Sequence, residues 1–393
     1  MKIMSFLAVA ACLLLPAAAA AQDSRTEEIA ARQEAKAANL RPYQPTAFEK
    51  IMGRLEENFA SPPNGFYPAF GRIYSGSGLR LGAGWRRFYS RKAVFDVHGL
   101  YSVKNYKLIE VGTWTPWHGA SRFAYGIKGG WLDATEVGYY GLGMDRAARR
   151  GNFQLSKGYA ALTAAARPNG WTRVSGEVGI DDFTTEESSR REPPISAVYD
   201  ASTAPGLGAS PAFLRVEGTA AIDWRTSPSY STRGGYYGVT VANHSNDTFG
   251  FTRLDGELIQ HVPLFYNNWV ISLRGRVQTI LDDEDLVPYF LLPQLGSGST
   301  IRGHSTGRFR DRHSILTSAE FRWIPNRLAL DMAIFYDAGK VTSARRDLDF
   351  SDLESSWGIG ARFHVPTSTI LRIEAARPKS GKWRLVVSTG AAF

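Results

Sequence analysis

From Phe66 to the end of the chain, apolar and polar residues alternate with a period of two over many long segments. Residues 213–225 show the alternation most clearly. One face there carries Leu214, Val216, Gly218, Ala220, Ile222 and Trp224, and the other carries Arg215, Glu217, Thr219, Asp223 and Arg225. A period of two is that of a β-strand with two unlike faces. The pattern therefore predicts an all-β protein.

Alternation alone does not decide which face of the sheet points inward. In a soluble sandwich the apolar face is buried, whereas in a transmembrane barrel it contacts lipid and the polar face lines the lumen. The alternating segments are about 9 to 13 residues long, which suits tilted strands that cross a bilayer. Strands in soluble sheets are commonly shorter, about 5 to 6 residues.

The C-terminal residues decide between these two folds. Residues 383–393 alternate up to Phe393, an aromatic residue that ends the chain. This resembles the C-terminal signal strand of bacterial outer-membrane proteins, which the barrel-assembly machinery reads during insertion. We therefore expect a barrel in the outer membrane of a bacterial cell. Its expected partners are outer-membrane lipids, lipopolysaccharide and, during its own insertion, that machinery.

The N-terminal residues predict export. An apolar run from Ile3 to Leu15 follows a lysine, and small residues precede position 22, so residues 1–21 are predicted to be a signal peptide. An alternative lipoprotein cut before Cys12 leaves an apolar core of only about six residues, shorter than the usual ~7 to 15. Cleavage after residue 21 removes the only cysteine. No later apolar run is long enough for a transmembrane helix.

Residues 22–65 carry helical signals instead of alternation. Ser24 with Glu27, and Thr46 with Glu49, have the spacing of capping boxes, in which the hydroxyl and the carboxylate satisfy each other's backbone amides. Two short helices are expected, in a segment that lies in the periplasm or in the barrel lumen.

The strands can be counted back from the C-terminus, which bacterial barrels place in the periplasm. The predicted strands lie near 66–74, 78–87, 93–103, 106–115, 121–132, 155–166, 171–182, 213–225, 234–244, 249–261, 268–281, 314–324, 328–338, 356–364, 369–376 and 383–393. Residues 66–393 are thus predicted to form a 16-stranded antiparallel transmembrane β-barrel, with the long connections outside. Pro68 lacks a donor for the ladder, which is tolerated at an edge or a weak seam.

Composition and motifs exclude several functions. The net charge is +9, but the basic residues lie singly, whereas nucleic-acid binding needs a basic stripe. Basic groups at 145–150 and 190–191, on predicted outer loops, either meet lipopolysaccharide phosphates or are solvated. The 7 histidines lack metal-ligand spacing, and no Gly-x-Ser-x-Gly elbow occurs. We expect neither an enzyme nor a metal or cofactor site.

The predicted outer loop 282–313 contains the motif Ile301, Arg302, Gly303, His304, and Glu320 and Asp337 follow on the next two predicted strands. Together these resemble the barrel domain of the BamA/TamA-type superfamily, the bacterial surface antigen barrel. The resemblance implies that the loop folds back into the lumen and that Arg302 pairs with Glu320 and Asp337. His304 departs from the family, which has an aromatic residue there.

The residues themselves support this pairing. Glu320 and Asp337 both fall on the polar faces of their strands, so both carboxylates are expected in the lumen. A guanidinium forms bidentate, permanently charged pairs with such groups. The alternative is a loop that lies loose outside with Arg302 solvated. Arg310, further along the same loop, is expected to be solvated.

The resemblance also bears on function. Insertases and translocators of this superfamily carry periplasmic POTRA domains before the barrel, whereas residues 22–65 are too few and too helical for one. The chain is therefore expected to be a short form that assists insertion or transport of protein or lipid at the outer membrane. The alternative is a passive pore or structural barrel without insertase activity, and a lipid-modifying barrel enzyme comes third. The sequence does not identify a client.

Overall fold

The computed structural model describes residues 28–34, 64–90, 93–115, 122–188, 190–265, 268–282, 286–325, 329–365 and 368–393. The chain divides into two units, Met1–Arg54 and Leu55–Phe393. In the first unit, residues 28–34 are helical and exposed, within the first of the two predicted helices. The predicted signal peptide and second helix lie outside the described residues. Within the described ranges, no helix is long and apolar enough to cross a membrane.

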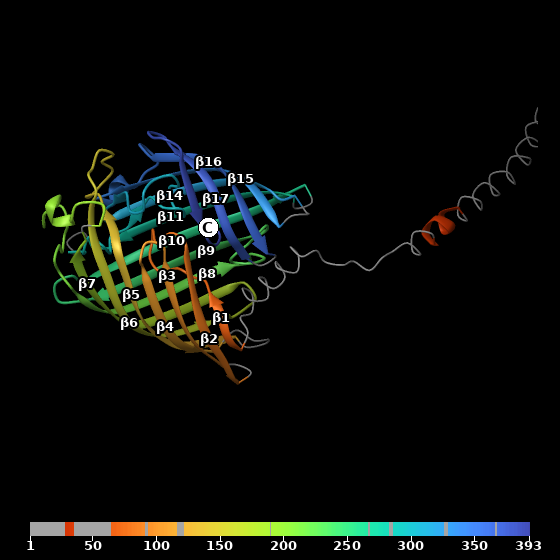
Figure 1. Ribbon diagram of the computed structural model, residues 1–393, viewed down its shortest axis with the longest axis horizontal. Coiled ribbons are helices and arrows are strands. Elements are labelled where there is room, and N and C mark those ends of the chain that lie inside the picture. The colour runs from red at the N-terminus through yellow and green to blue at the C-terminus, as the bar shows by residue number, and fades with distance from the viewer. Residues whose placement is uncertain are drawn as a thin grey trace, which may run out of the picture. The chain divides into compact units, whose positions relative to one another are not determined.

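The second unit is built on one antiparallel sheet of sixteen strands (Figure 1). The strands are β1 Gly65–Ala69, β2 Arg80–Ser90, β3 Ala93–Ser102, β4 Lys107–Trp114, β5 Phe123–Tyr139, β6 Gly151–Ala166, β7 Thr172–Glu187, β8 Ala212–Asp223, β9 Gly234–Ser245, β10 Phe251–Leu264, β11 Trp269–Ile280, β14 His313–Trp323, β15 Leu330–Thr342, β16 Glu354–Val365, β17 Ser368–Pro378 and β18 Arg384–Ser388. Each pairs with its neighbours in sequence. The predicted all-β class and count of sixteen are confirmed.

The two faces of the sheet are inverted relative to a soluble protein. On β8, Leu214 and Val216 are 50% and 46% exposed, whereas the side chain of Arg215 between them is 11% exposed. Arg215 donates to Asp181 on β7 at 2.9 Å, on the enclosed side. The apolar face therefore points away from the interior and the charged face points into it, as in a barrel surrounded by lipid.

Two long connections fold into the interior at the end of the sheet that we call the long-loop end. Residues 190–211, between β7 and β8, contribute Ile195, and residues 281–312, between β11 and β14, contribute Tyr289 and Phe290. Tyr289 packs edge-on against Tyr139 and Phe153, with ring centroids 5.1 and 4.8 Å apart. Burial of each such ring contributes about 1.5–3 kcal/mol. The interior at this end is a packed core.

At the opposite end, the connection between β8 and β9 (residues 224–233) also enters the interior. Ser229 O accepts from Thr369 N at 3.1 Å, and Tyr230 Oη donates to Asp331 Oδ2 at 2.9 Å. These partners lie on β17 and β15, remote from β8 and β9 in strand order. The connection therefore crosses the interior, and one cavity left beside Tyr230 measures only about 10 Å³, roughly the minimum for one water molecule.

The first and last strands of the sheet are shorter than predicted. β1 ends at Ala69 instead of residue 74, because the chain turns inward and buries Ile73 in the core (7% exposed). β18 ends at Ser388 instead of residue 393. The strand order runs from β1 to β18, and no ladder joins these two strands within the described residues.

The two ends of the sheet are nevertheless adjacent. Arg80 Nη2, at the start of β2, donates to Thr389 Oγ1, just after β18, at 2.5 Å. We call the place where the two ends meet the seam, and the space enclosed by the inner face of the sheet the lumen.

The alternation in sequence does not carry β18 to Phe393, so that prediction is wrong. Gly390 has a φ of +81°, a left-handed conformation that glycine adopts readily and that ends the strand. The last residues then turn into the lumen. The Phe393 ring stacks on His261 with centroids 6.4 Å apart and lies 5.9 Å from the Arg274 guanidinium carbon. The role of Phe393 as an insertion signal stays a prediction.

The predicted sidedness can be tested with single cysteines, because the mature chain is expected to have none. Ala201 is exposed in the connection between β7 and β8, and Ser229 lies in that between β8 and β9. We expect a membrane-impermeant maleimide to label Ala201→Cys in intact cells and Ser229→Cys only after the outer membrane is permeabilised. The reverse labelling would show that the topology is inverted.

Candidate functional site

The motif loop enters the lumen between the short strands β12 Gln294–Leu295 and β13 Phe309–Arg310, which pair with each other. Gly307 N donates to Gly296 O at 2.9 Å and closes the base of the loop. At the tip, Gly303 has a φ of +85°, and a Cβ there would lie 3.1 Å from Ala376 Cβ on β17. Only glycine allows the tip to pack this closely against the strand without strain.

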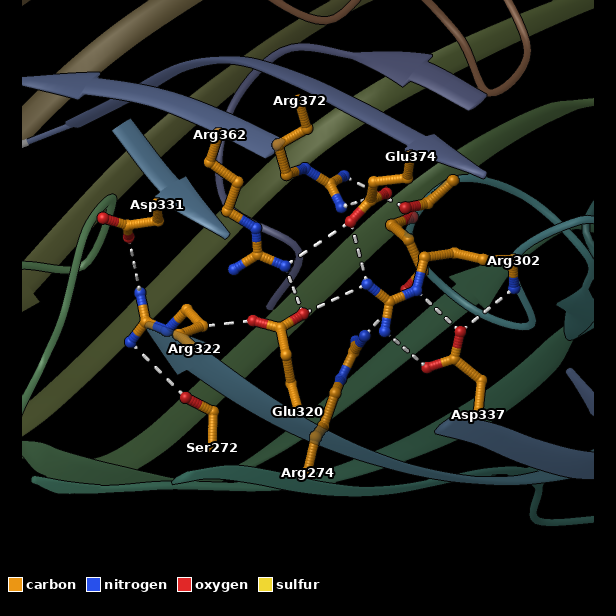
Figure 2. Close-up of polar contacts among 12 residues, drawn as sticks. Ser272, Arg274, Arg302, Glu320, Arg322, Asp331, Asp337, Arg362, Arg372 and Glu374 are labelled. Atoms are coloured by element: carbon orange, nitrogen blue, oxygen red, sulfur yellow. Dashed lines mark hydrogen bonds and ion pairs between the residues drawn. The ribbon is translucent and has the colours of Figure 1, made fainter. Parts of the chain in front are cut away.

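Arg302 lies in the lumen and is 1% exposed. Its Nε and Nη2 donate to Asp337 Oδ2 and Oδ1 at 2.7 and 2.9 Å, a bidentate pair. Its Nη1 donates to Glu320 at 3.1 Å and to Glu374 at 3.0 Å (Figure 2). The guanidinium carbon lies 3.5 Å from the centroid of the Phe335 ring. One side chain of the loop thus binds carboxylates from β14, β15 and β17.

Two further arginines complete the arrangement around these carboxylates. Arg362 on β16 donates to Glu320 and, at 3.4 Å, to Glu374. Arg372 on β17 donates to Glu374 Oε2 at 3.0 Å and to Gly298 O of the motif loop at 3.0 Å. We call Arg302, Glu320, Asp337, Arg362, Arg372 and Glu374 the charge cluster.

The charge cluster is buried, and the close pairing of its cations and carboxylates offsets the free-energy cost of removing them from water. Removing an ion from water costs several kcal/mol, and only close pairing with satisfied hydrogen bonds offsets this. Although burial alone lowers the pKa of Arg302, the charge of Asp337 and its hydrogen bond raise it above the ordinary value for arginine. The guanidinium therefore stays charged at every physiological pH, and its ion pairs with the carboxylates persist over that range.

The other motif residues pack around Arg302. Ile301 is fully buried in a small apolar cluster with Leu295 and Phe309 of the loop and residues of β14 and β15. The His304 ring lies against the Phe309 ring, with centroids 5.1 Å apart, in place of the aromatic residue that the resemblance implies. Burial, Arg384 and Arg308 lower the pKa of His304 to about 4, so this ring is neutral at pH 7.

The structure places Arg302 beside both Glu320 and Asp337, as the sequence predicts, and adds partners that the sequence analysis missed. Arg362, Arg372 and Glu374 lie on the polar faces of the last long strands, and this alternation was their only signal in the sequence. The alternative of a loose outer loop with a solvated Arg302 does not agree with its burial. That the cluster anchors the loop stays a prediction.

The prediction that Arg310 is solvated is wrong. Arg310 is 1% exposed, and it donates to Tyr289 O at 2.8 Å and to Gln294 Oε1 at 2.6 Å. Its guanidinium carbon lies 5.5 Å from the Tyr139 ring centroid. The loop folds into the lumen along its whole length, so a second arginine is buried where the base of the loop meets the core. Among the described residues, no group of three or more His, Cys, Asp or Glu is arranged to hold a metal ion.

The family model for the Omp85 superfamily domain matches residues 152–382, which include the motif loop and its partners on β14 to β17. The chain belongs to the Omp85 superfamily. The resemblance to BamA/TamA-type barrels is thereby confirmed. No curated protein sequence matches this Omp85 chain.

Solved structures share the fold of this Omp85 chain. BamA from Haemophilus ducreyi lacking POTRA domains 1–3 has a TM-score of 0.57 and 12% identity, over 83% of this chain and 67% of that one. CdiB from Acinetobacter baumannii has a TM-score of 0.50 and 12% identity, over 82% and 55%. CdiB from Escherichia coli has a TM-score of 0.51 and 12% identity, over 81% and 59%. The chain therefore spans little more than half of the CdiB chains.

The anchoring role of Arg302 can be measured by heat resistance of the folded barrel on a gel. Arg302→Ala leaves three carboxylates without their central cation, and loss of one partner of a buried pair typically costs about 3–5 kcal/mol. We expect a lower unfolding temperature and new protease cleavage at 304–313. Arg302→Lys should restore stability only in part, because it lacks the bidentate geometry.

Arg346→Ala is the matched control, since its side chain is 87% exposed in the connection between β15 and β16. It should leave both measurements unchanged. Equal behaviour of the Arg302 and Arg346 variants would show that the charge cluster does not hold the loop.

Proposed function

We propose that this chain is an outer-membrane barrel that assists the insertion or transport of protein or lipid at that membrane. The observation that carries the proposal is the seam, where β1 and β18 lack a ladder between them within the described residues. In lipid, unpaired backbone groups at a strand edge cost several kcal/mol each. Such an edge is stabilised by pairing with a strand of another chain.

The composition of the edge strands supports this proposal. Both strands have only five residues, and Pro68 in β1 lacks the N–H that a full ladder needs. Outward-facing residues on both sides of the seam are apolar and exposed, including Phe66 (84%) and Leu385 (72%). A client with an apolar, lipid-facing strand would find matching surfaces on either side.

The chain segments that fill the lumen are evidence against a passive pore. Connections enter it from both ends of the sheet, and the charge cluster with the motif loop lies between them. Lipopolysaccharide, other outer-membrane lipids and the barrel-assembly machinery are partners that the proposed location implies. The proposal names no particular client.

Insertion is tested with the purified chain in liposomes and an in-vitro synthesised eight-stranded outer-membrane barrel as client. We expect several-fold faster folding of the client than in empty liposomes. A photo-crosslinking residue at Leu385, on the edge strand, should capture the client.

The matched position is Ile334, which is 58% exposed on the same outer face but lies on the central strand β15. It should capture little client. Equal capture at both positions, or no acceleration, would overturn the proposal and leave a structural barrel.

A conductance measurement distinguishes the proposed function from that of a passive pore. In planar bilayers we expect the native chain to pass far less current than an open barrel of sixteen strands, because the lumen is filled. Arg302→Ala should raise the conductance by releasing the motif loop. A large steady conductance of the native chain would favour the passive pore.

A further inference from the structure

A cavity of about 650 Å³ lies in the lumen beside the seam, away from the carboxylates of the charge cluster. Its wall is formed by the connection between β1 and β2, the turn between β3 and β4, the end of β5 with Arg150, the motif loop, Arg372 of β17, and β18. Residues from both ends of the sheet therefore line it.

Positive charge dominates this cavity. Six cationic side chains line it against one carboxylate, that of Glu136. The cations are Arg72, Arg80, Lys104, Arg150, Arg372 and Arg384. Arg150 lies 3.5 Å from Glu136, and Arg372 pairs with Glu374 of the charge cluster.

The remaining four cations have no carboxylate within ion-pair distance among the described residues. Arg80 donates to the hydroxyls of Ser77 and Thr389 at 3.1 and 2.5 Å, and Arg384 donates to that of Ser305 at 3.0 Å. Hydroxyls orient a guanidinium without neutralising it. Partial desolvation and the neighbouring Arg150 lower the pKa of Lys104, and Glu136 opposes this shift.

Hydroxyl groups form most of the rest of the wall. Eight serine and threonine side chains line the cavity: Ser75, Ser77, Ser297, Ser299, Ser305, Thr306, Ser388 and Thr389. The Ser388 hydroxyl is buried and has no hydrogen-bond partner. A wall that combines uncompensated cations with hydroxyls suits a ligand that carries both phosphate groups and sugar hydroxyls.

We propose that this cavity binds a phosphorylated saccharide, either free or as the head group of a glycolipid. Exposed apolar residues flank the cavity outside the seam, Leu79 and Leu81 on one side and Leu385 on the other, at 56%, 61% and 72% exposure. A glycolipid can place its phosphates on the cations while its acyl chains stay along this apolar surface. The inference goes beyond the proposed function, because a chain without insertase activity would still bind the ligand.

Binding is measured on the purified full chain with two probes. Glucose 1,6-bisphosphate is titrated against the chain in zwitterionic detergent, with glucose as the unphosphorylated reference. Diphosphorylated lipid A is presented in phosphatidylcholine nanodiscs, with phosphatidylcholine alone as the reference. If both probes bind more tightly than their references, the cavity recognises a phosphorylated saccharide whether or not it is attached to lipid. If only lipid A binds more tightly than its reference, the site is one for a lipid head group.

The test variant is Arg72→Gln with Lys104→Gln, since neither side chain has a polar partner among the described residues. We expect Kd to rise at least tenfold, about the effect of losing one to two charge-assisted contacts. The control is Arg190→Gln with Arg346→Gln, which removes the same charge from exposed loops and should change Kd less than twofold. Equal weakening in both double variants would overturn the proposal, as would binding no tighter than that of the references.

A second variant covers the case in which the first does not fold. Ser75→Glu places a carboxylate at an exposed position of the cavity wall without removing any contact of the cations. It should abolish binding of the phosphorylated probes and leave heat resistance on a gel unchanged. Retained binding in this variant would overturn the proposal independently.

Discussion

Three carboxylates in the lumen converge on one buried guanidinium, that of Arg302. Arg302 forms hydrogen bonds with carboxylates on β14, β15 and β17, and its loop comes from between β11 and β14. β14 and β15 are adjacent in the sheet and β16 alone separates β15 from β17, so this one side chain links the loop to three strands in the same part of the wall. The apolar outer face provides no such restraint, since packing against lipid tails is not specific for a position along the strand. Specificity in this fold therefore comes from polar pairs on the inside.

The charged face of the sheet points inward, and this also determines how the lumen is filled. A sheet of sixteen strands encloses more space than inward-facing side chains can fill, which in porins leaves a channel. Here the space is occupied by chain: residues 190–211 and 286–312 enter from one end, and residues 224–233 and 389–393 from the other. The aromatic core around Tyr289 and the charge cluster lie in different layers of this filling. Any transport through such a barrel requires movement of these segments or passage along the seam.

Much of this architecture is encoded locally and was predictable. The period of two predicted the strands. The family resemblance of the motif implied the partners of Arg302, and the polar-face positions of Glu320 and Asp337 supported that pairing. Predictions failed where a tertiary contact overrides the local pattern. Residues 389–393 continue the alternation, but Gly390 turns them inward. Arg310 lies among polar residues in sequence, yet the loop folds it against Tyr139. Glu374 and Arg362 were indistinguishable in sequence from any other lumenal charge, because only the folding of the motif loop against β16 and β17 brings Arg302 to them.

The seam and the cavity beside it share one physical cause. Short edge strands leave the wall incomplete at this place, so the lumen is lined there by turns and by the motif loop instead of by paired strands. Turns and loops supply most of the hydroxyls together with Arg72 and Lys104, whereas Arg80 and Arg384 lie at the starts of β2 and β18. Along the rest of the wall, charges such as Arg215 with Asp181 are paired across adjacent strands by the ladder itself. The four cations without a carboxylate partner thus line the cavity beside the place where no ladder joins β1 and β18 among the described residues, so the proposed ligand would bind next to the two edge strands.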